Sequence, residues 1–182
     1  MVRTLLYALG GVLLGLVIHL VVILILPSAS GNAAYTRIAS IQATNKTTLI
    51  PLPAAGEPNP LHLDPDMAYA LCELDLSGGP GEVTGTLPLA FWSVAVYDRA
   101  GTVLYSTTNR DGIGQTLDLG IFDPAQTRLL AEQKIDIAPG LLIVEASTDE
   151  VFVVVRLAPP HPSMRERYEA QLQQLTCRNI AI

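Results

Sequence analysis

The sequence has little positive charge, no internal repeat and no run of charged residues. Its 182 residues include 11 Lys or Arg and 17 Asp or Glu side chains. Without Arg3, which precedes the first apolar segment, the remainder carries 10 basic and 17 acidic side chains, and 10 minus 17 gives a net charge of −7. Nucleic acids and anionic lipid surfaces both require a basic face on the protein. The composition therefore argues against either as a partner.

The sequence also lacks the short motifs that identify common active sites. It contains no GxSxG nucleophile elbow and no phosphate-binding P-loop, and the GIG triplet at 112–114 is not a dinucleotide fingerprint. His62 and His161 lie in proline-rich loops without the HxH or HExxH spacing of a metal site. We therefore predict no catalytic, cofactor-binding or metal-ligating residue. A Ser-His-Asp site that only the fold would assemble stays open.

A long apolar segment is present at the N-terminus, MVRTLLYALGGVLLGLVIHLVVILILP. Leu5 to Leu26 is 22 residues without a formal charge, and 16 of them are Leu, Ile or Val. A helix of about 22 residues spans roughly 33 Å, close to the hydrocarbon thickness of a bilayer. The apolar core of a signal peptide is usually shorter, at about 7–15 residues. The segment predicts a retained transmembrane helix, and the small residues at 28–33 leave a cleaved signal as the alternative.

Three residues of this span are candidates for contact with another helix. Gly11 and Gly15 are four residues apart, a spacing that lets two helices approach closely. His19 is polar at membrane depth, where such residues often face a partner helix or a cavity. Glycine is also common in membrane helices and a neutral imidazole costs less than a charge, so a helix–helix contact and no contact both stay open.

The two cysteines bear on the compartment of the domain that follows the span. Cys72 and Cys177 have the spacing of neither a CxxC redox pair nor a zinc site, and we predict a disulfide between them. Such a bond persists only in an oxidising compartment. The first basic residue after the span is Arg37, which weakly favours a cytoplasmic N-terminus. We predict a single-pass protein of the bacterial inner membrane with its C-terminal domain in the periplasm, and two reduced buried thiols are the alternative.

The chain divides into three predicted parts. Residues 1–27 form the tail and the transmembrane anchor, which Pro27 is expected to end. Residues 28–45 form a linker and a short helix over 32–43. Residues 46–182 form one β-rich periplasmic domain.

Two hairpins and two helices are predicted within the domain. FWSVAVYDRAGTVLYST carries β-branched and aromatic residues on both sides of DRAG, a hairpin connection in which Gly101 supplies a positive φ. LLIVEAS and EVFVVVRLA are expected to form the second hairpin. Asp123 and Pro124 predict the start of one helix, and a capping box at Ser163 predicts another that runs to about Cys177. The fold class is α+β, mostly antiparallel and sandwich-like, with two or three helices after one N-terminal transmembrane helix.

The segment from Asp64 to Asp111 resembles a bacterial family. DPDMAYALCELDLSGGP, followed after a gap by FWSVAVYDRAGTVLYSTTNRDG, is similar to the domain-of-unknown-function family 1254 and its companion family 1214. The N-terminal anchor, the two distant cysteines and the TCR near the C-terminus resemble short membrane-anchored proteins of alphaproteobacteria. The resemblance implies a β-rich fold and no agreed chemistry.

One patch of side chains is a candidate ligand site. It consists of Tyr97, Tyr105, Asn109, Arg110 and Asp111, on the first hairpin and its exit loop. Aromatic rings beside Arg and Asn can stack on and hydrogen-bond a sugar or a peptide. The alternative is that the tyrosines are half-buried residues of a sheet.

These features favour a non-enzymatic module that binds another envelope protein or a cell-wall component. The anchor, the expected disulfide and the missing motifs support that hypothesis. The alternative is a membrane-tethered hydrolase or other carbohydrate-active enzyme with its site near Tyr105–Asp111.

Overall fold

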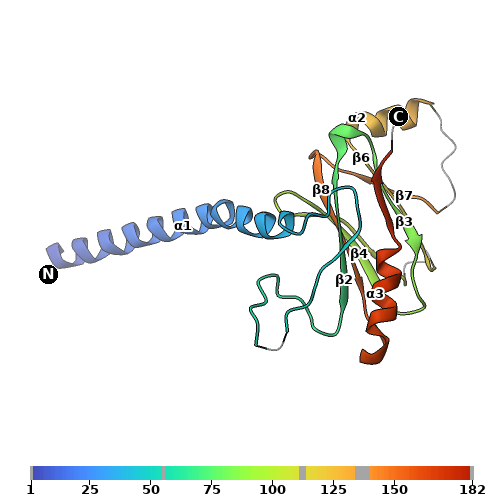
Figure 1. Cartoon of the computed structure of the whole chain (residues 1–182). Coiled ribbons are helices and arrows are strands. Elements are labelled where there is room, and N and C mark those ends of the chain that lie inside the picture. The colour runs from blue at the N-terminus through green and yellow to red at the C-terminus, as the bar shows by residue number, and fades with distance from the viewer. Residues whose placement is uncertain (1, 55, 111–113, 134–139, 181–182) are drawn as a thin grey trace.

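The computed structural model describes residues 2–54, 56–110, 114–133 and 140–180, and its first element is a long helix. Helix α1 covers Val2–Ala39, and Figure 1 shows its N-terminal part projecting away from a sheet-rich body. Val2–Leu26 of α1 is long and apolar enough to cross a membrane. A signal sequence near an N-terminus has the same properties. The predicted apolar helix is therefore confirmed, and its retention in the membrane stays a prediction.

The break expected at Pro27 is not present. Helix α1 continues without interruption to Ala39, so the short helix predicted over 32–43 is the last part of the same helix. A proline inside a helix removes one backbone hydrogen bond. A long apolar helix can continue through a proline when the adjacent backbone adjusts locally. The chain leaves the helix only after Ala39, and Gln42 then takes a positive φ of 55°.

Within the described residues, nine strands form two sheets. The five-stranded sheet has the order β1-β2-β8-β4-β5, all antiparallel, and its strands are β1 Thr48–Leu49, β2 Ala68–Asp75, β8 Glu150–Leu157, β4 Trp92–Asp98 and β5 Val103–Thr108. The four-stranded sheet has the order β7-β6-β3-β9, and its strands are β7 Leu142–Glu145, β6 Thr116–Phe122, β3 Gly81–Thr86 and β9 Thr176–Asn179. Only the β6–β7 pair is parallel. The predicted α+β, mostly antiparallel class is confirmed.

Short helices connect and cover the sheets. Their bounds are α2 Pro124–Gln133, α3 Arg165–Gln173, and the 3-10 turns η1 Leu76–Gly78 and η2 Pro162–Met164. The start of α2 is as predicted, because Asp123 Oδ1 accepts the backbone N–H groups of Ala125 at 2.7 Å and Gln126 at 2.8 Å. The capping box at Ser163 is not formed, since the residue before α3 is Met164 without a side-chain cap.

The core lies between the two sheets. One cluster of buried side chains draws on both, with Trp92 and Val153 from the five-stranded sheet and Val83 and Leu119 from the four-stranded sheet. Alternation along each strand puts every second residue into this cluster. Full burial of an aliphatic or aromatic side chain contributes about 1.5–3 kcal/mol. The cluster therefore holds the two sheets together as a sandwich.

The first predicted hairpin is confirmed, and the second is not. β4 and β5 pair around a turn in which Gly101 has φ 84° and Asp98 Oδ1 accepts the N–H of Thr102 at 2.7 Å. The second pair of segments, β7 and β8, belongs to different sheets. β7 pairs parallel with β6, and the N–H of Ala146 donates to the Phe122 carbonyl at 2.9 Å. The chain therefore crosses from one sheet to the other between β7 and β8.

Candidate functional site

The end of α1 covers part of the outer face of the five-stranded sheet, the face turned away from the four-stranded sheet. Tyr35 and Ile38 of α1 pack with Leu71 of β2 and Phe152 of β8 in a second, smaller apolar cluster. The Tyr35 and Phe152 rings meet edge to face, with centroids 5.4 Å apart. Alternation puts Leu71 and Phe152 on this face, because their neighbours Cys72 and Val153 belong to the core between the sheets.

A cleft of about 360 Å³ opens on the same outer face, between the end of α1 and the loop at 61–63. We call it the outer cleft. Its lining is mostly apolar and aromatic, with two guanidinium groups and one carboxylate. The lining residues are Tyr35, Ile38, Ile50, Leu61, His62, Leu63, Tyr69, Leu71, Tyr97, Asp98, Arg99, Gly101, Phe152, Val154 and Arg156. Concave sites with apolar walls and a few polar groups are typical of small-ligand binding.

A polar cluster joins α1 to the sheet at one end of the outer cleft. The Tyr35 hydroxyl donates to Glu150 Oε2 at 3.0 Å, and Arg99 Nη1 lies 3.2 Å from the same oxygen. The Arg99 guanidinium also lies over the Tyr35 ring, 4.7 Å from its centroid. Such cation–π contacts contribute about 0.5–1 kcal/mol at exposed sites. Tyr35 is therefore held through its ring and its hydroxyl, which fixes the end of α1 on the domain.

The same surroundings change the acidity of Tyr35. Burial, the hydrogen bond to Glu150 and the charge of that carboxylate raise the pKa of the phenol above its ordinary value of 10.0, while the Arg99 charge acts in the opposite direction. The protonated phenol is the form that donates to Glu150. The contact is therefore intact at neutral pH.

The two tyrosines of the predicted ligand patch lie on opposite faces of the five-stranded sheet. Tyr97 pairs with Phe152 and lines the outer cleft. Tyr105 pairs with Val96 and packs against the core between the sheets. Paired residues of neighbouring strands project to the same face, so Tyr105 shares the face of Val96. The two rings do not form one surface.

The polar residues of that patch are placed by backbone contacts. The Asn109 side-chain amide donates to the Ala90 carbonyl at 3.0 Å. Arg110 is exposed, and its backbone N–H donates to the Thr108 hydroxyl at 3.2 Å. Asp111 lies outside the described residues. Asn109 thus secures the end of the hairpin, and of the four patch residues that the structure describes only Tyr97 lines the outer cleft.

Gly11, Gly15 and His19 lie within the apolar part of α1. Their spacing of four residues places them along one side of the helix. All three are exposed, and none of the described residues comes within 4 Å of a Cβ built on either glycine. A second helix at this side stays a prediction.

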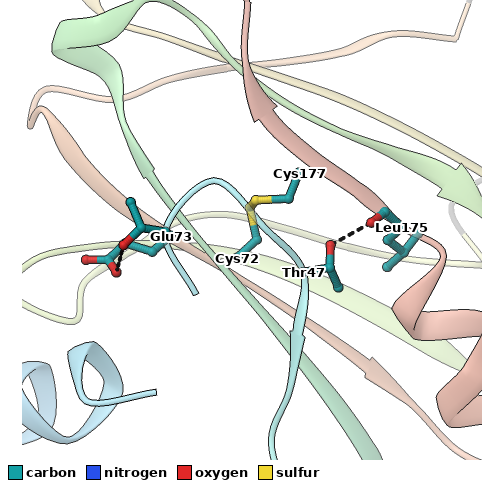
Figure 2. Close-up of a disulfide and its surroundings, with 6 residues drawn as sticks. Thr47, Cys72, Glu73, Leu175 and Cys177 are labelled. Atoms are coloured by element: carbon teal, nitrogen blue, oxygen red, sulfur yellow. Dashed lines mark hydrogen bonds between the residues drawn. A yellow bond between two sulfur atoms is a disulfide. The ribbon is translucent and has the colours of Figure 1, made fainter. Parts of the chain in front are cut away.

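The predicted disulfide is confirmed, and it joins the two sheets. Cys72 of β2 bonds to Cys177 of β9 across a sequence separation of 105, with their Cα atoms 6.1 Å apart (Figure 2). The residue before β1 is also held near this bond, because the Thr47 hydroxyl donates to the Leu175 carbonyl at 2.7 Å. Cys177 lies in a strand and not in the predicted helix, since α3 ends at Gln173 and residues of β9 pair with β3.

The histidines outside α1 have different surroundings. His62 lies on the rim of the outer cleft with a positive φ of 51°. His161 precedes η2, and its Nδ1 lies 2.8 Å from the Ser163 hydroxyl. Among the residues that the structure describes, no three His, Cys, Asp or Glu side chains gather closely enough to hold a metal ion.

A family model described as a protein of unknown function, DUF1254, matches residues 44–178. The chain belongs to the DUF1254 family. The match includes both disulfide cysteines and most of the strands, and it confirms the family that the sequence resembles. The companion family and the alphaproteobacterial type stay predictions.

Two solved structures that are similar to this chain come from longer chains. The VPA0106 protein from Vibrio parahaemolyticus matches with a TM-score of 0.59 and 11% identity over 83% of this chain and 35% of that chain. An uncharacterized protein from Burkholderia cenocepacia matches with a TM-score of 0.43 and 16% identity over 84% and 41%. The first likeness supports the fold of this DUF1254 domain. No curated protein matches, and the present chain spans less than half of either solved chain.

Sequence reasoning did not single out Tyr35 or Arg156 of the outer cleft. A signal for Arg156 exists, because Phe152, Val154 and Arg156 alternate on one side of β8. A charged Arg156 that follows Phe152 and Val154 on the same side of the strand indicates a polar side chain on a partly covered face. Tyr35 carries no such signal, since its contact with Glu150 spans 115 residues of sequence.

Proposed function

We propose that this protein is a single-pass protein of the bacterial inner membrane whose periplasmic domain binds another envelope protein or a cell-wall component. The observation that carries the proposal is the Cys72–Cys177 disulfide in a domain that follows an apolar helix. A disulfide between two sheets persists where thiols are not kept reduced. Both the apolar helix and the disulfide are explained if the helix stays in the membrane and the domain lies outside the cytoplasm.

The outer cleft supports a binding role. Its aromatic and aliphatic walls offer contact area, and Arg99 and Arg156 offer charge. The end of α1 forms one wall through Tyr35, so the cleft lies where the anchor meets the domain. A ligand or partner bound there would be held close to the membrane surface.

The alternative of a membrane-tethered hydrolase near Tyr105–Asp111 receives no such support. The Tyr105 ring packs against the core between the sheets, and the Asn109 amide is bound to the Ala90 carbonyl. Both side chains are partly buried and held by these contacts, and they do not line the outer cleft. We therefore place the binding role at the outer cleft.

A pair of C-terminal fusions tests the topology. Alkaline phosphatase folds only in an oxidising compartment, and green fluorescent protein fused in the same place gives the matched control for the cytoplasm. We expect phosphatase activity and no fluorescence. Fluorescence without phosphatase activity would reverse the topology and remove the proposed periplasmic role.

Crosslinking in intact cells tests the binding surface. A photoreactive residue at Leu61, on the rim of the outer cleft, is compared with one at Thr116, which is exposed on β6 of the other sheet. We expect one specific envelope product from position 61 and none from position 116. Equal products from both positions would exclude the cleft as the binding surface.

A further inference from the structure

Arg156 lies in the outer cleft, where none of the described residues neutralises it. Among these residues its buried Nε atom has no hydrogen-bond partner, and no carboxylate forms a salt bridge with its guanidinium. The register of β8 places Arg156 opposite Tyr69 of β2 and Ser93 of β4. A buried donor without a partner costs about 1–3 kcal/mol. A bound anion would satisfy this group.

The other charged side chains of the cleft are already engaged. Arg99 pairs with Glu150 at 3.2 Å. Asp98 Oδ1 accepts the N–H of Thr102 at 2.7 Å, within its own turn. Asp98 lies opposite Val151, five residues along β8 from Arg156, so among the described residues Arg156 is a cation of the cleft without an ion-pair partner. A single charge suits a carboxylate, which a guanidinium binds through two parallel hydrogen bonds, better than a doubly charged phosphate.

Apolar side chains of β8 and its neighbours line the cleft next to Arg156. Phe152 pairs with Tyr97, Val154 pairs with Leu71, and Arg156 follows in the third row. Phe152 and Arg156 are four residues apart on one strand, or about 13 Å. The cleft volume of about 360 Å³ is near the lower end for small-molecule sites. A cleft of this volume and lining fits a small apolar body with an anionic group beside Arg156.

The position of the cleft indicates where such a molecule comes from. Tyr35 follows Leu26, the last residue of the apolar span, by nine residues of the same helix, or about 14 Å. If Val2–Leu26 crosses a membrane, the outer cleft lies close to the surface of that membrane. A molecule with one apolar chain and a carboxylate collects at the surface of a bilayer, because its chain is buried in lipid while its charge stays in water.

We propose that the outer cleft binds a single-chain acyl carboxylate, with Arg156 pairing its carboxylate and the partly buried side chains of Tyr97 and Val154 contacting its chain. The inference deepens the proposed function by giving the binding module a ligand class, and it rests on that function for the source of the ligand.

Calorimetric titration of the full chain in phosphatidylcholine vesicles tests the proposal. Decanoate and decanol are titrated separately, and protein-free vesicles of the same lipid give the blank. Wild-type protein should bind decanoate about tenfold or more tightly than decanol, because only decanoate pairs with Arg156. Equal affinity for the two would overturn the proposal without any variant.

Two substitutions assign the preference to one side chain. Arg156→Met keeps the length and apolar stem and should remove the preference for decanoate. Arg178→Met is the control, because Arg178 is exposed on β9 of the other sheet, where it pairs with Glu82 at 2.7 Å. It should leave the preference unchanged. An unchanged preference in Arg156→Met would exclude Arg156 as the binding group.

A third ligand tests the acyl class. The aromatic acid 2-naphthoate carries the same charge on a shorter, wider body. Decanoate should bind more tightly, and tighter binding of 2-naphthoate would contradict an acyl ligand. The titrations do not depend on which side of the membrane the domain occupies, so their failure is distinguishable from a failure of the fusion experiment.

Discussion

The inner face of the five-stranded sheet is sealed, whereas its outer face is only partly covered. On β8 the inner residues are aliphatic and at most 2% exposed, namely Val151, Val153, Val155 and Leu157. The outer residues of the same strand are of mixed type, namely Glu150, Phe152, Val154 and Arg156. The inner face stabilises the fold through burial, and the outer face holds the end of helix α1 and a cleft. One strand thus serves stability on one side and, in our proposal, binding on the other.

The largest expected effect on the free energy of unfolding is at the disulfide, on the inner face of the five-stranded sheet. Replacing both cysteines, Cys72→Ala with Cys177→Ala, should lower the free energy of unfolding by about 4–5 kcal/mol, because the bond closes a long loop in the unfolded chain. Urea unfolding of the full chain in vesicles measures this through Trp92, the single tryptophan, which is buried in the core. Reductant should lower the wild-type midpoint and leave the double variant unchanged. Equal wild-type midpoints with and without reductant would contradict the assignment.

Adjacent valines of β8 compare the two faces directly. Val153→Ala, on the inner face, should lower the free energy of unfolding by about 2 kcal/mol, since it removes two carbons from a closed core. Val154→Ala, on the outer face, should cost roughly half of that or less, because its side chain is only partly buried. The same urea titration measures both. Equal losses would mean that the outer face is as closely packed as the inner one.

The smallest expected effect on the free energy of unfolding is at the contact between Tyr35 and Glu150. Tyr35→Phe should cost about 1 kcal/mol or less at neutral pH, because it removes one partly exposed hydrogen bond and keeps the ring. The pKa of Tyr35 is raised, so the folded state favours the protonated phenol, and this stabilisation is complete below pH 10.0 and is lost as the pH rises through the raised pKa. Urea midpoints at pH 9 and pH 11 should therefore differ more for wild type than for Tyr35→Phe. An identical pH dependence would show that the phenol does not titrate in this contact.

Local patterns predicted much of the inner side of the sandwich. The hairpin around Gly101, the start of α2 at Asp123 and the Cys72–Cys177 pairing each follow from short-range chemistry or from the pairing of the only two cysteines. The pairing of β7 with β6 could not be predicted in this way, because tertiary packing decides which sheet a strand joins. The helix expected after Ser163 is present as α3, but the sequence patterns missed its end at Gln173 and the strand β9 that follows, because pairing with β3 and the disulfide at Cys177 take precedence over a continuing helix.

The candidate site was less accessible to sequence reasoning. Tyr97 and Tyr105 are both aromatic residues of one hairpin, and a β-bulge between Val96 and Tyr97 disturbs simple counting across the strands. Only the register shows that the two rings project to opposite faces. The wall that Tyr35 contributes depends on helix α1 continuing past Pro27, which runs against the local preference of proline.

Intact-mass measurement of the chain from the membrane fraction, after thiols have been trapped in living cells with an alkylating reagent, tests the central claim most directly. The account predicts one species near 19.5 kDa that retains its apolar N-terminal segment and carries no alkyl group, since both sulfur atoms are bonded to each other. A species that lacks the segment, or one that carries two alkyl groups, would contradict a membrane-held domain on the oxidising side.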